Sequence, residues 1–511
     1  MRRLAPWLLA ALAGCAQAAS IASPLNGAPL WWLQMLSLAG LVALLERAHG
    51  VRSAGLLAWT FSTAWLCATF WWLFISMHTY GGLPAPLAVL AVVGLAAFLG
   101  SYYAVAGAVY RAMRPRSLWM RALGFGGLWL VAELLRATWF TGFPWGAGGY
   151  AHVDGSAHWL APLVGVNGLG ALAAGLSAAF AGSFYRRRPV WAGLVAVIAV
   201  IGAYWPQSAS MPSPMAPMSL ALLQGNIPQD EKFQEGSGVP LALEWYGKAL
   251  QDAQETLVVA PETAIPVLPQ DLPDGYADTL RKRFGSGEQA AIVGIPLGNA
   301  NAGYSNAAIG LKPGQADVYT YEKHHLVPFG EFIPPLFRWF TEMMSIPLGD
   351  FRRGEIGQPS FDWKGQRLAT NICYEDLFGD ELARRFIDPA SAPTIFVNIS
   401  NIGWFGNTVA IDQHLNISRM RALEFARPMV RATNTGATVV IDDRGAVAAS
   451  LEPYTRAVLH TTVTGRDTPP TPYARWAGRF GNGPLWLLGL GTALWAGLAT
   501  RSRRRSQDIK N

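Results

Sequence analysis

The sequence predicts a polytopic α-helical membrane domain with eight transmembrane helices, joined to an α/β layered domain. Two observations predict this fold class. Of the 511 residues, 51% are hydrophobic and only 14% are charged, whereas average soluble chains carry about 25% charged residues. Residues 207–475 depart from this composition, because short β-type runs there alternate with amphipathic helical patterns. We therefore expect a transmembrane domain at 1–206, the α/β domain at 207–475, and an eighth helix with a basic tail at 476–511.

Eight apolar segments have about the 20 residues that a helix needs to cross a bilayer, or slightly fewer. They lie near 1–19, 30–45, 54–76, 86–110, 120–140, 158–183, 190–205 and 483–500. The first segment also resembles a cleaved signal peptide, since Leu12-Ala-Gly-Cys15 is similar to a lipoprotein cleavage box. We favour an uncleaved helix, because a polytopic protein seldom needs a cleaved signal.

Basic residues fall in alternate connections between these segments, which predicts their orientation. The connections at 20–29, 77–85 and 141–157 contain no Lys or Arg, and the other connections and both termini carry basic clusters. Positively charged loops stay in the cytoplasm, so both termini are expected there and the α/β domain in a periplasm-like space. Residues 207–482 hold 29 acidic and 23 basic residues, so this part of the chain is net negative. The net charge of +7 therefore comes from the basic connections and termini and reports the membrane topology. No nucleic-acid partner is expected.

Glu133 and Arg136 stand three residues apart within the fifth apolar segment. An ion pair inside a membrane is a functional hypothesis by default. The alternative, which we favour, is that the pair is a structural contact or that Arg136 reaches toward the interface.

The α/β domain is expected to contain nine strands and four helices, which form layers with helices outside. The predicted strands are 219–224, 256–260, 290–294, 306–311, 317–321, 367–372, 394–398, 429–432 and 437–441. The predicted helices are 240–254, 274–285, 377–386 and 412–427.

Cys373 stands at a predicted strand-to-helix junction, within Asn371-Ile-Cys-Tyr-Glu-Asp376. A side chain there is exposed at the end of the strand, and the N-terminus of the following helix lowers the pKa of a thiol. The alternative is a small buried hydrophobe, but the polar neighbours favour a nucleophile. Cys15 and Cys67 lie in apolar segments, and no Cys or His spacing suits zinc, so neither an internal disulfide nor a metal site is expected.

Glu262 follows another apolar strand and lies between two prolines, in Val258-Val-Ala-Pro-Glu-Thr-Ala-Ile-Pro266. Partial burial would raise the pKa of this carboxyl group and suit it to accept a thiol proton. The alternative is an ordinary acid at the start of a helix.

Lys323 directly follows a third predicted strand, and Glu331 lies eight residues later, beyond a Pro-Phe-Gly turn. A lysine in this position is suited to stabilise a tetrahedral oxyanion. Glu331 is placed to orient the lysine or the thiol. Taken alone, each residue would more often be a solvated charge.

In the order Glu262, Lys323, Cys373, these stretches resemble the Glu-Lys-Cys triad of the nitrilase, or carbon–nitrogen hydrolase, superfamily. The whole chain resembles the apolipoprotein N-acyltransferase family, whose nitrilase domain is flanked by transmembrane helices. Motifs in the family's order carry the resemblance: 142–145 (GFPW), 224–229 (QGNIPQ), 325–331 (HLVPFGE), 373–375 (CYE), 404–406 (WFG), 421–428 (RALEFARP) and 433–436 (TNTG). One departure is Phe233, where the family usually places Trp.

The resemblance implies an αββα sandwich and an acyltransferase that needs no cofactor and no metal. It implies that Cys373 carries the acyl chain as a thioester, in two half-reactions at one site. The implied partners are a phospholipid donor such as phosphatidylethanolamine, a diacylated apolipoprotein acceptor and membrane lipids, with a monomeric enzyme in a bacterial inner membrane. Supporting or substrate-binding roles fall on Glu331, Tyr374, Glu375, Phe233 and Trp404.

Residues 332–348 are strongly apolar within an otherwise polar domain. We interpret them as an arm that dips into the outer leaflet, with Gly349 to Gly357 as its hinge and Arg352 and Arg353 near lipid phosphates. The alternative is a buried core helix.

Two rival functions remain at the level of sequence. A membrane-anchored amidase would use the same triad with water as the acceptor, and would release free fatty acid. A membrane scaffold or transporter with a degenerate nitrilase domain would not need the intact triad.

Overall fold

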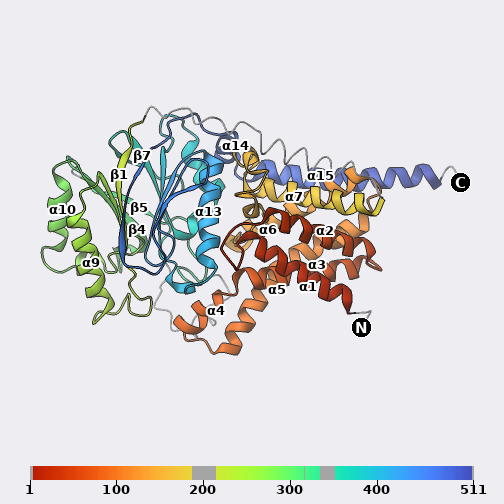
Figure 1. Cartoon of the computed structure of the whole chain (residues 1–511), viewed down its shortest axis with the longest axis horizontal. Helices are drawn as coiled ribbons and strands as arrows, with labels where there is room; N and C mark the ends of the chain where they lie inside the picture. The colour runs from red at the N-terminus through yellow and green to blue at the C-terminus, as the bar shows by residue number, and fades with distance from the viewer. Residues whose placement is uncertain (1–3, 187–214, 316, 334–350, 509–511) are drawn as a thin grey trace. The chain divides into compact units, whose positions relative to one another are not determined.

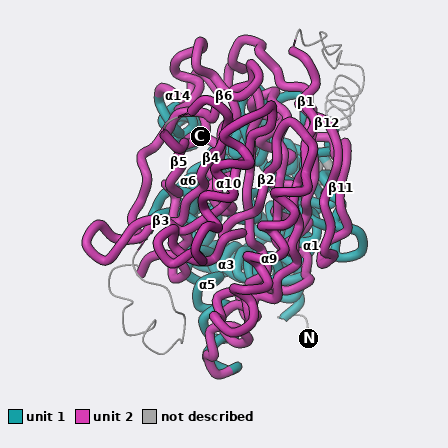
Figure 2. The backbone as a smooth tube through the Cα atoms, turned by 90° about the vertical axis from the view of Figure 1, so that its left-hand side faces the viewer, with its two compact units in different colours: residues 1–71, 85–209, 480–511 teal, residues 72–84, 210–479 magenta. Residues whose placement is uncertain are grey.

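The computed structural model describes residues 4–186, 215–315, 317–333 and 351–508 (Figure 1). The chain divides into two compact units (Figure 2). The helical unit comprises residues 1–71, 85–209 and 480–511, and the sandwich unit comprises 72–84 and 210–479. The short segment 72–84 therefore packs with the sandwich unit, although helices of the other unit precede and follow it in the chain.

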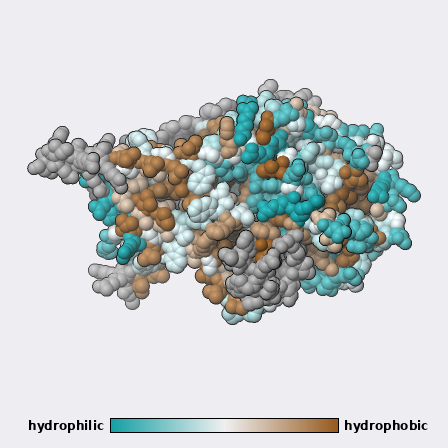
Figure 3. Space-filling view, turned by 180° about the vertical axis from the view of Figure 1, so that it is seen from behind, coloured by the Kyte–Doolittle hydropathy of each residue, from teal (hydrophilic) through white to brown (hydrophobic). Residues whose placement is uncertain are grey.

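The helical unit contains the apolar helices that the composition predicts. They are α1 (Ala5–Ile21), α2 (Trp31–Arg47), α3 (Val51–Phe70), α5 (Ala85–Met113), α6 (Leu118–Thr138), α7 (Ala161–Arg186) and α15 (Gly483–Asp508). Many large hydrophobic side chains on them are exposed, Leu12, Leu90, Val105 and Leu487 among them, and brown patches mark such residues in Figure 3. Such a surface suits contact with lipid rather than water, and the chain is a membrane protein.

The eight predicted spans are not all confirmed. Among the described residues, three helical stretches are long and apolar enough to cross a bilayer: Ala85–Met113, Leu118–Thr141 and His158–Ser183. The third predicted span, 54–76, is wrong as a single helix, because the chain bends by 62° between Val51–Phe70 and Leu73–Tyr80; counting this pair as one span gives four. The apolar helices Ala5–Ile21 and Gly483–Ala499 are shorter, and the predicted span 190–205 lies outside the described residues.

The Glu133–Arg136 pair holds a loop inside the helical unit. Arg136 is buried and donates to the carbonyl oxygens of Phe143 at 2.9 Å and Trp145 at 2.7 Å, while its guanidinium lies 3.4 Å from Glu133. Glu133 in turn accepts a hydrogen bond from the backbone N–H of Gly148 at 3.2 Å. Both charges are therefore used to fix the backbone of residues 143–148, which favours the structural interpretation of this pair.

The sandwich unit is built from two six-stranded sheets. The first sheet has the order β12-β1-β2-β3-β4-β5, and the second has the order β11-β10-β9-β8-β7-β6. The strands of the first are β1 (Met218–Gln224), β2 (Leu257–Val259), β3 (Ala290–Asn299), β4 (Gly303–Leu311), β5 (Tyr319–Glu322) and β12 (Ala457–Val463). Those of the second are β6 (Phe361–Trp363), β7 (Gln366–Ile372), β8 (Ile395–Ser400), β9 (Met429–Thr433), β10 (Val439–Ile441) and β11 (Val447–Ser450).

Each sheet has three parallel strands at its centre and antiparallel strands at its edges. Strands β1, β2 and β3 are parallel, and so are β7, β8 and β9. Ligands of open α/β sheets bind beyond the carboxyl ends of parallel strands. This topology therefore defines the edge of the sandwich at which a site is expected.

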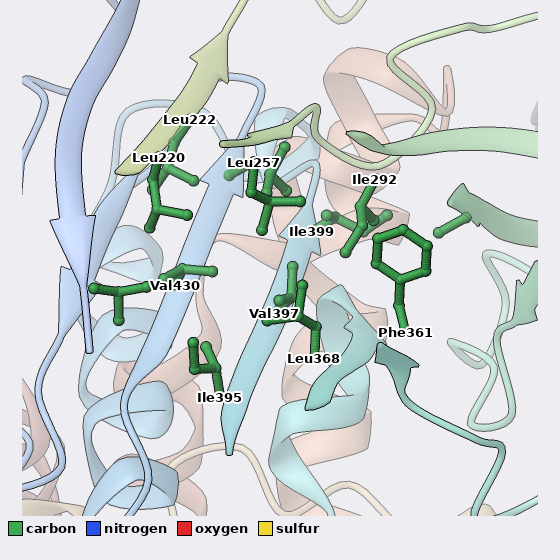
Figure 4. Close-up of a cluster of buried hydrophobic side chains, with 14 of the residues drawn as sticks. Leu220, Leu222, Leu257, Ile292, Phe361, Leu368, Ile395, Val397, Ile399 and Val430 are labelled. Carbon is green, nitrogen blue, oxygen red and sulfur yellow. The ribbon is translucent and has the colours of Figure 1, made fainter. Parts of the chain in front are cut away.

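The core between the sheets follows from alternation along the strands. Leu220 and Leu222 of β1 belong to the same buried cluster as Val430 of β9 and Val397 of β8, and Figure 4 shows Val430 near Leu220. The intervening residues face outward, where α9 (Gly238–Asp252) and α10 (Tyr276–Gly285) cover the first sheet. Helix α13 (Ala410–Phe425) lies on the opposite side of the sandwich in Figure 1, so the two-sheet αββα architecture is confirmed.

Most predicted elements of this unit are present, with two kinds of difference. Strands β6, β11 and β12 are additional, and all three are edge strands with weak apolar patterns. The predicted helix 377–386 is wrong: the chain forms a 3-10 turn (Cys373–Leu377), the single-turn α12 (Gly379–Leu382) and another 3-10 turn (Ala383–Phe386).

Segment 72–84 is anchored to the sandwich unit by aromatic packing. It contains α4 (Leu73–Ile75) and a π-helical turn, η1 (Ser76–Tyr80). Trp72 is fully buried, donates from its indole nitrogen to Gln413 Oε1 at 3.0 Å, and packs against Phe405 with ring centroids 4.2 Å apart. The bend after α3 is thus stabilised by contacts outside the helical unit.

Replacing Leu222 with Ala should destabilise the sandwich unit, because Leu222 is fully buried between the sheets. A cavity there costs about 2–5 kcal/mol, which lowers the thermal midpoint by roughly 5–10 °C. Thermal unfolding of the detergent-solubilised protein measures this. Val447→Ala on the exposed edge strand β11 is the control, and equal shifts for the two variants would contradict the assigned core.

Candidate active site

Polar residues gather where the parallel strands of both sheets end. Glu262 follows β2, Cys373 directly follows β7, and Asn401 directly follows β8. Lys323 follows β5 at an outer position of the first sheet. Residues from four strands thus meet at the carboxyl edge that the topology singles out.

A buried ammonium group between two carboxylates forms the centre of this site. Lys323 Nζ lies 3.3 Å from Glu262 Oε1 and 2.9 Å from Glu331 Oε1. Asn306 of β4 donates from Nδ2 to the same two oxygens, at 2.6 and 2.7 Å. The second oxygen of Glu262 accepts the backbone N–H of Asn401 at 2.8 Å. The structure therefore brings Glu262, Lys323 and Glu331 together and holds them with two asparagines.

These contacts set the charges of the cluster. Burial opposes the charge on Lys323, but Glu262 and Glu331 outweigh it and raise the pKa of the amine, so it stays an ammonium. Burial would raise the pKa of Glu262, but Lys323 and the hydrogen bond from Asn306 lower it below its ordinary value. The expectation of a raised pKa for Glu262 is therefore wrong: neighbouring positive charge, invisible in the local sequence, outweighs burial.

Cys373 has a positive backbone φ angle and a thiol with a raised pKa. Its φ is +50°, a region that non-glycine residues adopt only when their surroundings hold them there. Burial and the charge of Glu262 raise the pKa of the thiol to about 12, while Lys323 and Ser400 act in the opposite direction. A lowered thiol pKa was expected from a helix N-terminus. This expectation is wrong, because burial and the charge of Glu262 raise the pKa, and Cys373 opens a short 3-10 turn instead of an α-helix.

A second buried network holds the carbonyl oxygen of Cys373. His414 Nε2 lies 3.3 Å from this oxygen and 3.0 Å from Asp376 Oδ1, and Arg431 lies 3.2 Å from His414 Nδ1. Since a guanidinium group can only donate, Nδ1 is the acceptor and Nε2 carries the proton. Asn398 Nδ2 lies 3.3 Å from the same carbonyl oxygen. The Asp376–His414 pair therefore contacts the backbone carbonyl oxygen of Cys373. For this reason we do not assign His414 as the base that accepts the thiol proton.

Glu375 connects the 3-10 turn that begins at Cys373 to the segment that contains Lys323. Its Oε2 accepts the N–H of Ile372 at 2.6 Å and the hydroxyl of Tyr321 at 2.8 Å, and its Oε1 accepts the N–H of His324 at 2.7 Å. Tyr374 is buried and packs on Phe378 and His325, with ring centroids 5.2 and 5.6 Å away. Both residues shape the turn around Cys373.

The segment after the predicted arm is bound through its backbone to the chain at Lys323 and Glu331. Gly354 N–H donates to the carbonyl oxygen of Lys323 at 2.9 Å, and Phe351 N–H donates to that of Glu331 at 2.9 Å. The guanidinium of Arg352 pairs with Glu322, and that of Arg353 lies 4.9 Å above the Phe332 ring. Residues 334–350, which include the greater part of the arm, lie outside the described residues.

Phe233 and Trp404 lie at partly exposed positions. Phe233 is 41% exposed, and its ring centroid is 6.0 Å from Lys232 Nζ. Trp404 meets Tyr80 edge to face at 5.8 Å. Neither residue has an assigned contact with Glu262, Lys323 or Cys373 among the described interactions, so their role in substrate binding stays a prediction.

Several site residues were missed at the level of sequence. Asn306 looked like one more residue of an apolar strand, and Asn401 and His414 contact the site only through the fold. Lys232 is fully buried and donates to the carbonyl oxygen of Glu262 at 3.1 Å, and burial lowers its pKa to about 7. Only the adjoining QGNIPQ motif pointed to this stretch.

In the described ranges, no group of three or more His, Cys, Asp or Glu side chains is arranged to hold a metal ion.

Comparison with known families agrees with this architecture. Residues 13–179 match the model of the apolipoprotein N-acyltransferase N-terminal domain, and residues 219–473 match the carbon–nitrogen hydrolase model. An apolipoprotein N-acyltransferase of Verminephrobacter eiseniae is 55% identical over 98% of this chain and 97% of its own. The chain belongs to the apolipoprotein N-acyltransferase family.

Other members of the apolipoprotein N-acyltransferase family are less similar in sequence, and they too match at least nine-tenths of both chains. The protein from Ralstonia nicotianae is 45% identical and covers 93% of this chain and 90% of its own. The one from Bordetella bronchiseptica is 40% identical over 98% of both chains. The similarity thus includes both units and the C-terminal helix.

The Cys373 thiol should react slowly with iodoacetamide at neutral pH, because a pKa of about 12 leaves little thiolate. We expect the alkylation rate to rise continuously from pH 7 to 10 in a Cys15→Ser/Cys67→Ser background. Replacing Lys323 with Met removes the charge that lowers the thiol pKa, so the rate at each pH should fall. A rate that levels off below pH 8 would contradict the assigned protonation state.

Proposed function

We propose that this protein transfers an acyl chain from a phospholipid to the α-amine of the diacylglyceryl-cysteine at the N-terminus of apolipoproteins. The observation that carries the proposal is the ammonium of Lys323 between Glu262 and Glu331, at the same sheet edge as the half-buried Cys373. The printed names of the relatives agree with the proposal, and so does an apolar helical unit that lets lipid substrates approach. Lipoprotein maturation is the process that such a transfer completes.

In the first half-reaction, Cys373 attacks the acyl ester of the phospholipid. Because the resting thiol is protonated and Glu262 is ionised, Glu262 removes the proton as the new C–S bond forms. The carbonyl oxygen gains negative charge, and Lys323 stabilises it as a fixed cation. Glu262 then protonates the departing glycerol oxygen. The lysophospholipid departs, and the acyl chain remains on Cys373 as a thioester.

In the second half-reaction, the α-amine of the acceptor attacks the thioester. An amine displaces a thiolate far more readily than an alkoxide, so the thioester drives amide formation. Glu262 accepts the proton that the attacking nitrogen loses, and this proton returns to the sulfur of Cys373 as the C–S bond breaks. The two substrates use the same site in sequence, which is ping-pong chemistry.

The remaining residues act by position. Glu331 and Asn306 hold the Lys323 ammonium beside Glu262, and a buried ion group needs such partners to remain charged. His414 and Asn398 hold the carbonyl oxygen of Cys373 and support its positive φ. Phe233 and Trp404 contribute substrate contacts at the edge of the site.

The cellular setting forms part of the same proposal. We place the protein in a bacterial inner membrane as a monomer, with both termini in the cytoplasm and the sandwich unit in the periplasm, where lipoproteins mature. The basic connections of the helical unit support this orientation. Phosphatidylethanolamine is the expected donor, and the apolar arm near 332–348 is expected to enter the outer leaflet.

The purified protein, given phospholipid and a diacylated lipopeptide, should produce a triacylated lipopeptide that mass spectrometry detects. Cys373→Ala should abolish the product, while Cys15→Ser should leave it unchanged. Release of free fatty acid without triacylated peptide would favour the amidase alternative and contradict the proposal.

Replacing Asn306 with Leu should lower turnover, because two buried carboxylates each lose a charge-assisted hydrogen bond. The loss is about 10- to 100-fold, from roughly 1.5–3 kcal/mol for such a bond. Loss of the Asn306 donor also raises the pKa of Glu262, so the acid limb of the pH–rate profile should move to higher pH. The control is Asn301→Leu in an exposed turn, and an unchanged pH profile for the Asn306 variant would count against this role.

A further inference from the structure

Helix α14 (Pro472–Phe480) has one face packed on the sandwich unit and a second face of different chemistry. Tyr473, Ala474, Ala477 and Gly478 are buried, and the ring of Tyr473 lies 5.5 Å from that of Phe425. The backbone of α14 is held too, since Arg384 donates to the carbonyl oxygen of Gly478 at 3.0 Å. The orientation of the helix on its own unit is therefore fixed.

The outward face combines two arginines with two aromatic residues. Arg475 and Arg479 are exposed and four residues apart, and Trp476 and Phe480 form a parallel stripe beside them. Phe480 is 66% exposed. Within the described part of the chain, neither arginine forms an ion pair, and the sequence contains no acidic residue between Asp467 and Asp508. Cations with adjacent aromatic rings are the composition of helices that lie in a lipid–water interface.

The chain itself brings this face close to lipid. Only Gly481 and Asn482 separate α14 from α15, whose apolar part is Gly483–Ala499. Three peptide steps reach at most about 11 Å, and the headgroup layer on each side of a bilayer is roughly 5–7 Å thick. The C-terminal end of α14 is thus confined to the neighbourhood of the headgroups wherever α15 enters the membrane.

We propose that α14 is a headgroup-binding helix, in which Arg475 and Arg479 bind anionic phospholipid headgroups while Trp476 and Phe480 enter the interfacial layer. Arginine binds phosphate oxygens through paired N–H donors, which suits this ligand. The surface differs from the catalytic site in its residues and its chemistry. It gives the sandwich unit a fixed, lipid-dependent contact with the bilayer next to its last helix.

The first test compares lipid retention by the full-length, detergent-solubilised protein. Native mass spectrometry counts bound phosphatidylglycerol and phosphatidylcholine for the wild type and for Arg475→Gln/Arg479→Gln. Two arginines near a charged surface contribute enough that retention of phosphatidylglycerol should fall on the order of tenfold, with phosphatidylcholine unchanged. Arg281→Gln/Lys282→Gln on the exposed face of α10 removes the same charge and should retain the wild-type preference. Equal retention by the two double variants would overturn the proposal.

A second measurement does not depend on the arginine variants. A fluorophore attached at Phe480→Cys, in a chain whose three native cysteines are replaced, is placed in nanodiscs. Quenching by a lipid with a headgroup spin label, together with protection from aqueous iodide, supports the proposal. Quenching by iodide alone would show that this face lies in water and would overturn it. Neither readout uses acyl transfer, so failure here is distinguishable from failure of the proposed function.

Discussion

The structure of the site depends on one constraint: a lysine ammonium is buried between two carboxylates and must be compensated in full. Lys323 is 1% exposed, and an uncompensated charge at that depth would cost several kcal/mol. Glu262 and Glu331 supply the opposite charge, and Asn306 donates to both of them, so each oxygen that faces the lysine is also hydrogen-bonded. The ammonium is therefore held in place by the fold itself, as the proposed stabilisation of an oxyanion requires.

The sandwich supplies this compensation by convergence of chain segments that are distant in sequence. Glu262 comes from the first sheet and the N–H of Asn401 from the second, so the two sheets are joined through one carboxylate. On the other side of Cys373, Asp376, His414 and Arg431 form a fully buried network that ends on the carbonyl oxygen of Cys373. The positive φ of Cys373 is maintained because its surroundings determine it from several directions.

The sequence predicted correctly which residues follow strands, but it predicted the pKa shifts of Glu262 and Cys373 wrongly. Strand ends follow from local patterns, whereas pKa shifts depend on residues that are distant in the sequence. Apolar, β-type runs place Glu262, Lys323 and Cys373 after strands, which local pattern alone can indicate. The pKa of Glu262 shifts opposite to expectation because of the charge of Lys323, which lies 61 residues away, and the pKa of Cys373 does so because of burial and the charge of Glu262. Strand β12 and the bend after α3 were missed likewise, since β12 pairs with β1 and Trp72 with Gln413 across long stretches of chain.

The central claim, that Cys373 carries the acyl chain, is tested most directly by supplying the purified protein with phospholipid and no acceptor. Mass spectrometry should then show an adduct of one acyl chain on the peptide containing Cys373, and neutral hydroxylamine should remove it, as expected for a thioester. An adduct on another residue, an adduct resistant to hydroxylamine, or no adduct despite production of triacylated peptide would contradict the account.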